Sequence, residues 1–278
     1  MLTYESTSRF ADADGVRVHY HEAGEGPPLL MIHGGAPGAF GWGNFGRNLE
    51  VLSRSFRTVI VDLPGYGRSG KPDAPGGRNQ MYADVMTALI ETIGLGRPHV
   101  LGMATGGAAA IKMAADNPGC LEKLILVSSA GGHTMFHTPP LTAPHRDYYT
   151  GDGPSREKMR AYLEYIVHDH SLITDEILDE RYEASVAPEF MATAPEGKGG
   201  KSNIPDDLWK RLDEITAQTL IVWGRENRIQ PFENAVFMLS RIKRARLHVF
   251  GECGLWVPYE RMIEFNALVT DFLSPSVG

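Results

Sequence analysis

The chain has 278 residues, and its 27 Lys and Arg against 34 Asp and Glu give a formal net charge of −7. This length suits one large core with an inserted subdomain. The acidic balance without a dense basic block argues against a nucleic-acid or membrane partner and favours a small molecule. Two cysteines, a polar N-terminal stretch and the lack of a membrane-length apolar run predict a cytoplasmic protein without a disulfide framework.

Strand-like and helical patterns alternate through the first half of the chain and return near its end. This alternation is typical of a mostly parallel sheet with helices on its faces. The expected strands are Val16–Glu22, Leu29–His33, Thr58–Asp62, a short run at Val100, Leu124–Ser128, Thr219–Trp223 and Arg246–Phe250. The expected core helices are Phe45–Ser53, Met81–Ile93, Gly106–Ala115 and Tyr259–Leu273.

Between His133 and Leu212 the strand signal stops and the pattern becomes helical. The first amphipathic helix is expected to bury Met159, Tyr162, Leu163, Ile166 and Val167. The second begins at an N-cap, Thr174, with acidic residues in its first turn. The Gly- and Pro-rich stretch 194–203 predicts a mobile loop. We therefore divide the chain into a core at 1–133, a helical cap at 134–212 and a second core part at 213–278.

The sequence Gly102-Met103-Ala104-Thr105-Gly106 follows a short strand and precedes a helix of small residues. A serine hydrolase carries Gly-x-Ser-x-Gly in this context, as the nucleophile elbow. Here the middle residue is alanine, so the tight turn is kept without a hydroxyl at its apex.

Several motifs spread over most of the chain carry a resemblance to a known family. They are His33-Gly34-Gly35-Ala36-Pro37-Gly38 with Trp42, Asn44 and Arg47; Asp62-Leu63-Pro64-Gly65-Tyr66-Gly67-Arg68-Ser69; the elbow; Trp223-Gly224-Arg225-Glu226; and Cys253-Gly254-Leu255-Trp256. The chain resembles the alpha/beta-hydrolases, and within them the meta-cleavage-product hydrolases that split carbon–carbon bonds in ring-opened aromatics. The resemblance implies an alpha/beta-hydrolase fold, with a mostly parallel eight-stranded sheet flanked by helices and an inserted helical cap.

The resemblance also implies a Ser-Asp-His triad, and the three corresponding positions here read Ala104, Asn227 and Leu255. Alanine has no oxygen for nucleophilic attack, leucine accepts no proton, and asparagine cannot stabilise an imidazolium. Two accessory positions depart as well: the residue before the serine is Met103, and the cap arginine that holds a substrate carboxylate falls near Pro195.

Backbone donors for an oxyanion remain at two places in the sequence. The His33-Gly34-Gly35 loop supplies the amide of Gly35, and the elbow supplies the amide of Thr105. The side chains expected to line the substrate pocket are Ala36, Trp42, Asn44, Met103, Ala104, Leu255 and Trp256.

His133, at the junction of core and cap, is the candidate for acid–base chemistry. His33 is expected to brace its loop, and His137 and His145 lie among prolines as loop residues. Cys253 is expected to be a small buried residue rather than a nucleophile. The tyrosine pair Tyr148-Tyr149 either lines the pocket or packs the cap.

Loss of the reactive groups with retention of the loop, elbow and cap favours a non-hydrolytic enzyme, a cyclase, isomerase or lyase of secondary metabolism acting on an apolar or aromatic carbonyl compound. The first alternative is a non-catalytic binder or receptor for a small molecule. The second is a hydrolase with relocated catalytic groups. No cofactor and no metal are expected, because no ligand spacing or dinucleotide motif is present. The family resemblance allows a homodimer.

Overall fold

The computed structural model describes residues 2–74, 76–133, 143–191 and 207–274. Its sheet has eight strands in the order β1-β2-β4-β3-β5-β6-β7-β8. The bounds are β1 Ser8–Ala13, β2 Val16–Ala23, β3 Pro28–Ile32, β4 Arg57–Val61, β5 His99–Met103, β6 Lys123–Val127, β7 Gln218–Gly224 and β8 Ala245–Phe250. Only the β1–β2 and β2–β4 pairs are antiparallel. The expected mostly parallel eight-stranded sheet is thus confirmed.

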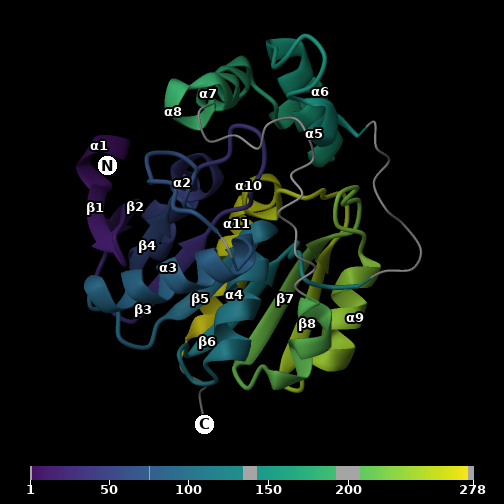
Figure 1. The fold of residues 1–278 in the computed structure, drawn as a ribbon. Helices are drawn as coiled ribbons and strands as arrows, with labels where there is room; N and C mark the ends of the chain where they lie inside the picture. Colours follow the sequence, from purple (N-terminus) through teal and green to yellow (C-terminus); the bar gives the residue numbers. More distant parts are fainter. Residues whose placement is uncertain (1, 75, 134–142, 192–206, 275–278) are drawn as a thin grey trace.

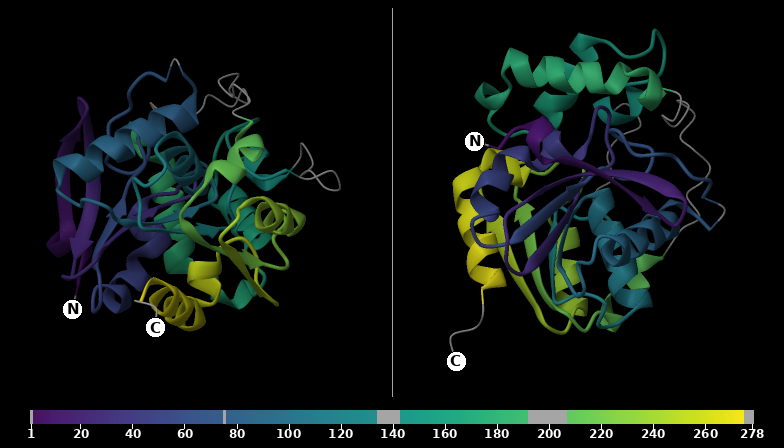
Figure 2. Two further views of the ribbon diagram at one scale, coloured as in Figure 1. Left: turned by 90° about the horizontal axis from the view of Figure 1, so that it is seen from below. Right: turned by 90° about the vertical axis from the view of Figure 1, so that its left-hand side faces the viewer.

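Helices cover both faces of this sheet, as Figure 2 shows from below. The core helices are α2 Gly41–Leu52, α3 Arg78–Thr92, α4 Thr105–Asp116, α9 Glu233–Arg241, α10 Val257–Glu260 and α11 Met262–Leu273, with a 3-10 helix, η2, at Leu208–Glu214. Helices α3 and α4 pack with η2 and α9 over one apolar cluster, and α2 and α11 lie over the other. The alpha/beta-hydrolase architecture therefore places a buried core on each side of the sheet.

A group of helices lies above the carboxyl ends of the parallel strands, at the top of Figure 1. It consists of α5 Pro144–Asp147, α6 Arg156–Ile166, η1 His170–Leu172, α7 Asp175–Val186 and α8 Pro188–Met191. The side chains of Met159, Tyr162, Leu163, Ile166 and Val167 are buried. Thr174 caps α7 by accepting a hydrogen bond from the Ile177 amide at 3.3 Å. These local features match the expectation, while the domain division at 134 and 212 stays a prediction and the loop at 194–203 lies outside the described residues.

Some elements of the core differ from the expected ones. Strand β1 and the short helix α1, Tyr4–Thr7, have no strong apolar period, because β1 is an edge strand with partly exposed side chains. Helix α9 was also not foreseen. The expected terminal helix 259–273 is two helices, α10 and α11, that meet at Arg261, where φ is −123°.

Candidate active site

The elbow joins β5 to α4 at Ala104, whose backbone has φ 46° and ψ −112°. A positive φ is costly for a residue with a Cβ, so the turn is strained. A Cβ at Gly102 would stand 2.4 Å from the Gly106 carbonyl oxygen, and one at Gly106 would stand 2.3 Å from that of Ile32. The glycines are therefore required by close backbone approach, and the apex residue is held at the carboxyl end of the sheet.

The loop after β3 lies beside this elbow and is braced by His33. The His33 Nδ1 donates to the Gly34 carbonyl at 2.8 Å, and its Nε2 accepts from the Leu63 amide at 2.9 Å. Burial lowers the pKa of His33 to about 4, so the ring is neutral near pH 7. This is the bracing role expected from the sequence, with both ring nitrogens satisfied and neither free to react.

Gly35 and Thr105 both line one cavity of about 180 Å³, which we call the inner pocket. A Cβ at Gly35 would approach the Tyr66 hydroxyl to 2.7 Å and the Thr105 Oγ1 to 3.0 Å, so the loop and elbow are in close contact. Thr105 is the first residue of α4, where backbone N–H groups lack intrahelical acceptors. Gly35 and Thr105 thus lie side by side in the wall of the inner pocket, and their expected role as oxyanion donors stays a prediction.

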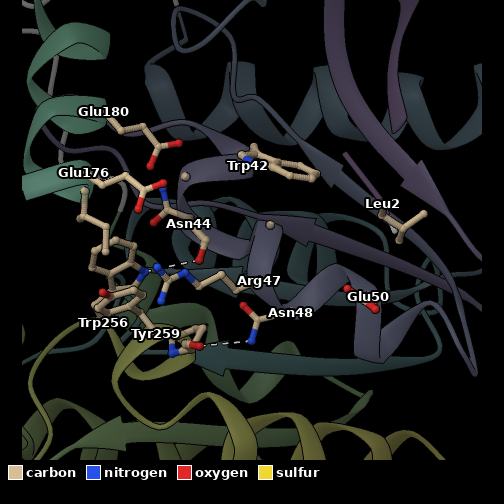
Figure 3. A pocket seen from close by; sticks show the side chains of 14 residues that line it. Leu2, Trp42, Asn44, Arg47, Asn48, Glu50, Glu176, Glu180, Trp256 and Tyr259 are labelled. Carbon is tan, nitrogen blue, oxygen red and sulfur yellow. Dashed lines mark hydrogen bonds between the residues drawn. The ribbon is translucent and has the colours of Figure 1, made fainter. Parts of the chain in front are cut away.

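Most of the expected lining residues are brought together in this pocket. Its wall includes Ala36, Asn44, Met103, Ala104, Leu255 and Trp256. Trp42 is not part of that wall. It lines a neighbouring cavity of about 410 Å³, which we call the outer groove (Figure 3). Asn44 and Trp256 line both cavities.

Arg181 of α7, one of the helices above the strand ends, lines the inner pocket and was not foreseen from the sequence. The residue is 3% exposed and donates to the carbonyls of Gly38 and Gly43 at 3.2 and 3.3 Å. Its Nε is buried and has no hydrogen-bond partner among the described residues. Burial lowers its pKa, but an arginine stays charged at any ordinary pH. Its spacing of four from the buried Ile177 was the signal that could have found it.

The resemblance placed the carboxylate-binding cap arginine near Pro195, which lies outside the described residues. That expectation stays a prediction. Arg181 is a buried guanidinium that lines the inner pocket.

His145 was expected to be a loop residue, but the structure places it in a short helix. It lies in α5 and lines the inner pocket, with its ring stacked on Tyr165 at a centroid distance of 6.3 Å. Its Nδ1 is enclosed and has no hydrogen-bond partner among the described residues. Burial, with a smaller contribution from Arg146, lowers its pKa. His137 lies outside the described residues.

His133, the candidate acid–base residue, is not brought to the inner pocket. Its side chain is exposed, and its ring stacks on Trp209 with the centroids 4.9 Å apart. Phe237 contacts the same ring at 5.9 Å. The structure thus gives this residue an aromatic packing environment at the surface.

The other two positions of the implied triad lie after β7 and after β8. Asn227 caps a turn: its Oδ1 accepts from the amides of Ile229 and Gln230 at 3.0 and 2.9 Å. Leu255 faces the inner pocket, and its amide donates to the Ile166 carbonyl at 2.8 Å. Burial strongly raises the pKa of the neighbouring Cys253 thiol, so this buried cysteine is a poor nucleophile, as expected.

A hydroxyl, an imidazole and a carboxylate are linked by hydrogen bonds elsewhere in the fold. The Ser8 Oγ lies 2.8 Å from the His19 Nε2, and the His19 Nδ1 lies 2.7 Å from the Asp62 Oδ2. Asp62 also accepts from the amides of Gly41 and Arg68 at 2.7 and 3.0 Å. None of these residues lines the inner pocket, and Ser8 lies in a strand rather than at a helix N-terminus. These hydrogen bonds therefore tie β1 and β2 to the turn after β4.

Tyr148 and Tyr149 pack within the cap rather than line the inner pocket. The two rings meet edge to face at 4.8 Å, and the Tyr149 hydroxyl donates to the Ser185 carbonyl at 3.2 Å.

None of the helices in the described ranges has the length and apolar character to cross a bilayer.

Comparison with known proteins now adds a family to this geometry. The model of the Alpha/beta hydrolase family matches residues 29–268. The 2-hydroxy-6-oxo-6-phenylhexa-2,4-dienoate hydrolase of Comamonas testosteroni is 35% identical over 280 residues, which cover 98% of each chain. A 2-hydroxy-6-oxononadienedioate/2-hydroxy-6-oxononatrienedioate hydrolase of Burkholderia vietnamiensis is 32% identical, covering 98% of this chain and 97% of that one.

A similar solved structure is the meta-cleavage product hydrolase CumD of Pseudomonas fluorescens IP01, a serine-to-alanine variant complexed with acetates. It has a TM-score of 0.83 and 30% identity, and the match covers 95% of this chain and 96% of that chain.

These relatives overturn the functional expectation from the sequence. A cyclase, isomerase or lyase was favoured because reactive side chains are missing, but the relatives matched over nearly the full chain are named hydrolases. The likeness over nearly the full chain is thus a better guide to the class of reaction than the residue types at three single positions.

Proposed function

The chain belongs to the alpha/beta hydrolase family, and from this premise we propose that it is a hydrolase acting on a ring-opened aromatic 2-hydroxy-6-oxo-dienoate. The ligand would lie in the inner pocket, with its carboxylate on Arg181 and its keto oxygen on the amides of Gly35 and Thr105. Met103, Leu255 and Trp256 would contact its apolar part. This proposal rests on the similarity to relatives whose names carry this substrate class.

The buried guanidinium of Arg181 is the observation that carries the proposal. Arg181 lines the inner pocket at 3% exposure, and no carboxylate forms an ion pair with it among the described residues. A buried charge is costly unless an opposite charge pairs with it. A planar carboxylate matches the geometry of the guanidinium fork. An apolar pocket with one such cation suits an acid that has a long conjugated or aromatic body.

We infer that Ala104, Asn227 and Leu255 stand at the positions where relatives carry the triad, so no acyl-enzyme forms at the elbow. Hydrolysis then needs direct addition of water to the keto carbon, with the developing oxyanion held by the two amides. The bond from that carbon to the dienoate breaks and the dienoate carbon takes a proton, which gives a carboxylic acid and a shortened hydroxydienoate. Rate enhancement without a triad is about 10³-fold over water in another hydrolase.

The test uses the purified protein with 2-hydroxy-6-oxo-6-phenylhexa-2,4-dienoate. Calorimetry measures binding, and chromatography measures benzoate released over the protein-free rate. We expect binding and slow, protein-dependent release of benzoate. Gly35→Pro should abolish this release because proline has no amide hydrogen, whereas Gly35→Ala, which also adds a Cβ beside Tyr66 and Thr105 but keeps that hydrogen, should retain more of it. Binding with chemically unaltered ligand after long incubation would contradict the hydrolase, and a lack of binding would contradict the substrate class.

We also propose that the partner is a small molecule and that the protein forms a homodimer, as the family resemblance allows. Hydrolysis by addition of water needs no cofactor. A cytoplasmic location stays a prediction.

A further inference from the structure

We propose that the protein has a second binding site, outside the inner pocket, for a small aromatic molecule that carries an anionic group. The site is a cavity of about 500 Å³, which we call the arginine groove. Arg17 of β2 and Arg68 of the segment after β4 line it together with Phe10 of β1. This site does not depend on the proposed hydrolysis, so either of the two can fail alone.

The side chains of Arg17 and Arg68 converge on the ring of Phe10. The guanidinium carbon of Arg17 lies 3.9 Å from the ring centre, and that of Arg68 lies 4.9 Å from it. Both arginines are exposed, and neither forms an ion pair with a carboxylate among the described residues. Two like charges beside one ring repel each other, and an anion in the groove would be attracted by both.

Two neighbouring carboxylates have other partners. Asp12 stands opposite Arg17 in the β1–β2 register, but its Oδ1 accepts a hydrogen bond from the Gly15 amide at 2.8 Å. Asp62 is buried, and it accepts from the main-chain amide of Arg68 rather than from the guanidinium. The two guanidinium groups are therefore available to a ligand, and each can bind a carboxylate through two parallel N–H donors.

The rest of the arginine groove suits an aromatic body. Burial, and to a smaller extent Asp62, raise the pKa of the Tyr4 phenol, while the charge of Arg68 opposes that rise. Tyr4 thus keeps its hydroxyl hydrogen near the guanidinium, as a further donor for an anion. A cavity of this volume with few polar groups is typical of a small-molecule site. Aromatic rings and small side chains complete the wall: Tyr4, Ala39, Phe40, Ala184, Ala187 and Phe190.

The arginine groove lies between the β1–β2 part of the sheet and the helices above it. Ala184 belongs to α7, and Figure 1 shows α7 and α8 above that part of the sheet. Ala39 lines both the arginine groove and the inner pocket. Among the described lining residues, Arg181 belongs to the inner pocket and not to the arginine groove. The two cavities are therefore neighbours that carry separate cations.

The outer groove is a less suitable place for an anion. Three glutamates, Glu50, Glu176 and Glu180, line it, and Arg47 is the one cation among its described lining residues (Figure 3). The whole chain also has a formal net charge of −7. An anionic ligand is thus repelled by most of the protein and attracted where two unpaired arginines share one cavity.

The test titrates the protein, labelled with ¹⁵N in its arginine side chains, with sodium benzoate and follows the Nε–H signals by NMR. The signals of Arg17, Arg68 and Arg181 are assigned by their loss in the three Arg→Gln variants. Benzamide is the ligand control, because it has the same ring without the charge. Arg9→Gln is the protein control, because Arg9 is an exposed arginine next to Phe10 in β1 and so points to the opposite face.

We expect the Arg17 and Arg68 signals to shift saturably with benzoate and not with benzamide. Arg17→Gln should raise the Kd read at Arg68 about fivefold, and Arg68→Gln should do the same for the Kd read at Arg17, because each removes one partly solvated charge. Arg9→Gln should leave both values unchanged. A shift of the Arg181 signal alone, or equal shifts with benzoate and benzamide, would overturn the inference.

A second variant tests the cavity while it keeps both charges. Ala184→Phe places a ring in the wall of the arginine groove and should abolish the saturable shift of Arg17 and Arg68. Circular dichroism establishes that the variant is folded. An unchanged Kd in folded Ala184→Phe would place the anion outside the groove and contradict the proposal. If the variant does not fold, the titration of the unaltered protein with benzoate and benzamide decides.

Discussion

The guanidinium carbon of Arg181 lies 4.4 Å from the centre of the Trp256 ring, so a cap helix and the segment after β8 meet over the inner pocket. Arg181 also donates to two carbonyls of the core. One side chain therefore holds the cap on the core and presents the pocket's cation.

Replacing Arg181 by glutamine should weaken binding of the dienoate about 10- to 100-fold, because a hydrogen bond to a charged group contributes about 1.5–3 kcal/mol. Calorimetric titration measures the change. The control is Arg160→Gln, an exposed cap arginine paired with Asp175. Equal affinity in Arg181→Gln and the unaltered protein would refute the carboxylate site.

A hydroxyl placed at the elbow by a single substitution should have little effect on the rate of benzoate release. Ala104→Ser without a neighbouring base is expected to raise benzoate release by less than about tenfold, since a lone hydroxyl is a weak nucleophile. The triple change A104S/N227D/L255H supplies nucleophile, acid and base together and should raise it by about 10³-fold or more. Equal rates for the single and triple variants would show that these three positions do not form a triad.

Stability should fall as the pH drops from about 6.5 toward 4. Burial lowers the pKa of both His21 and His33 to about 4, so the unfolded chain binds more protons than the folded one in this window. Each histidine then removes about 1.4 kcal/mol of unfolding free energy per pH unit. Urea unfolding at pH 7 and pH 5 measures this loss. His21→Asn should reduce the change of unfolding free energy per pH unit. An unchanged slope in that variant would exclude His21 as a contributor.

The buried pair of His19 and Asp62 should matter for stability and not for catalysis. Asp62→Asn is expected to cost about 3–5 kcal/mol, because it removes one partner of a fully buried pair. Ser8→Ala should cost about 1 kcal/mol, the value of one hydrogen bond. Chemical denaturation measures both changes. If Ser8→Ala abolished benzoate release, the reactive centre would have to be placed at Ser8 instead of the inner pocket.

The central fold was accessible from sequence because its signals are local. The glycines around Ala104 are required by close contacts within the elbow and with the neighbouring strand β3. Buried parallel strands are recognisable as apolar runs. The edge strand β1 was missed because its partly exposed side chains carry no such period.

The residues of the candidate site could be predicted only in part from the sequence, for a different reason. Gly35, Thr105, Met103 and Leu255 belong to motifs, so their meeting could be foreseen. Arg181 and His145 line the pocket from helices whose placement depends on tertiary packing. The spacing of four between Ile177 and Arg181 indicates which face of α7 is buried, but not that this face meets the pocket. His133 was expected at the pocket from its position after β6, but aromatic neighbours hold it at the surface.

Ala104 keeps the positive φ that an elbow imposes on its apex residue, although alanine gains no reactivity from that conformation. The backbone at this point is already the one that a hydroxyl would need. Every alanine codon is one base change away from a serine codon, so a hydroxyl at this position is one mutational step away, whereas a proton acceptor at Leu255 would need a separate change. A single substitution at the elbow would therefore supply a hydroxyl in the right backbone without the base that activates it.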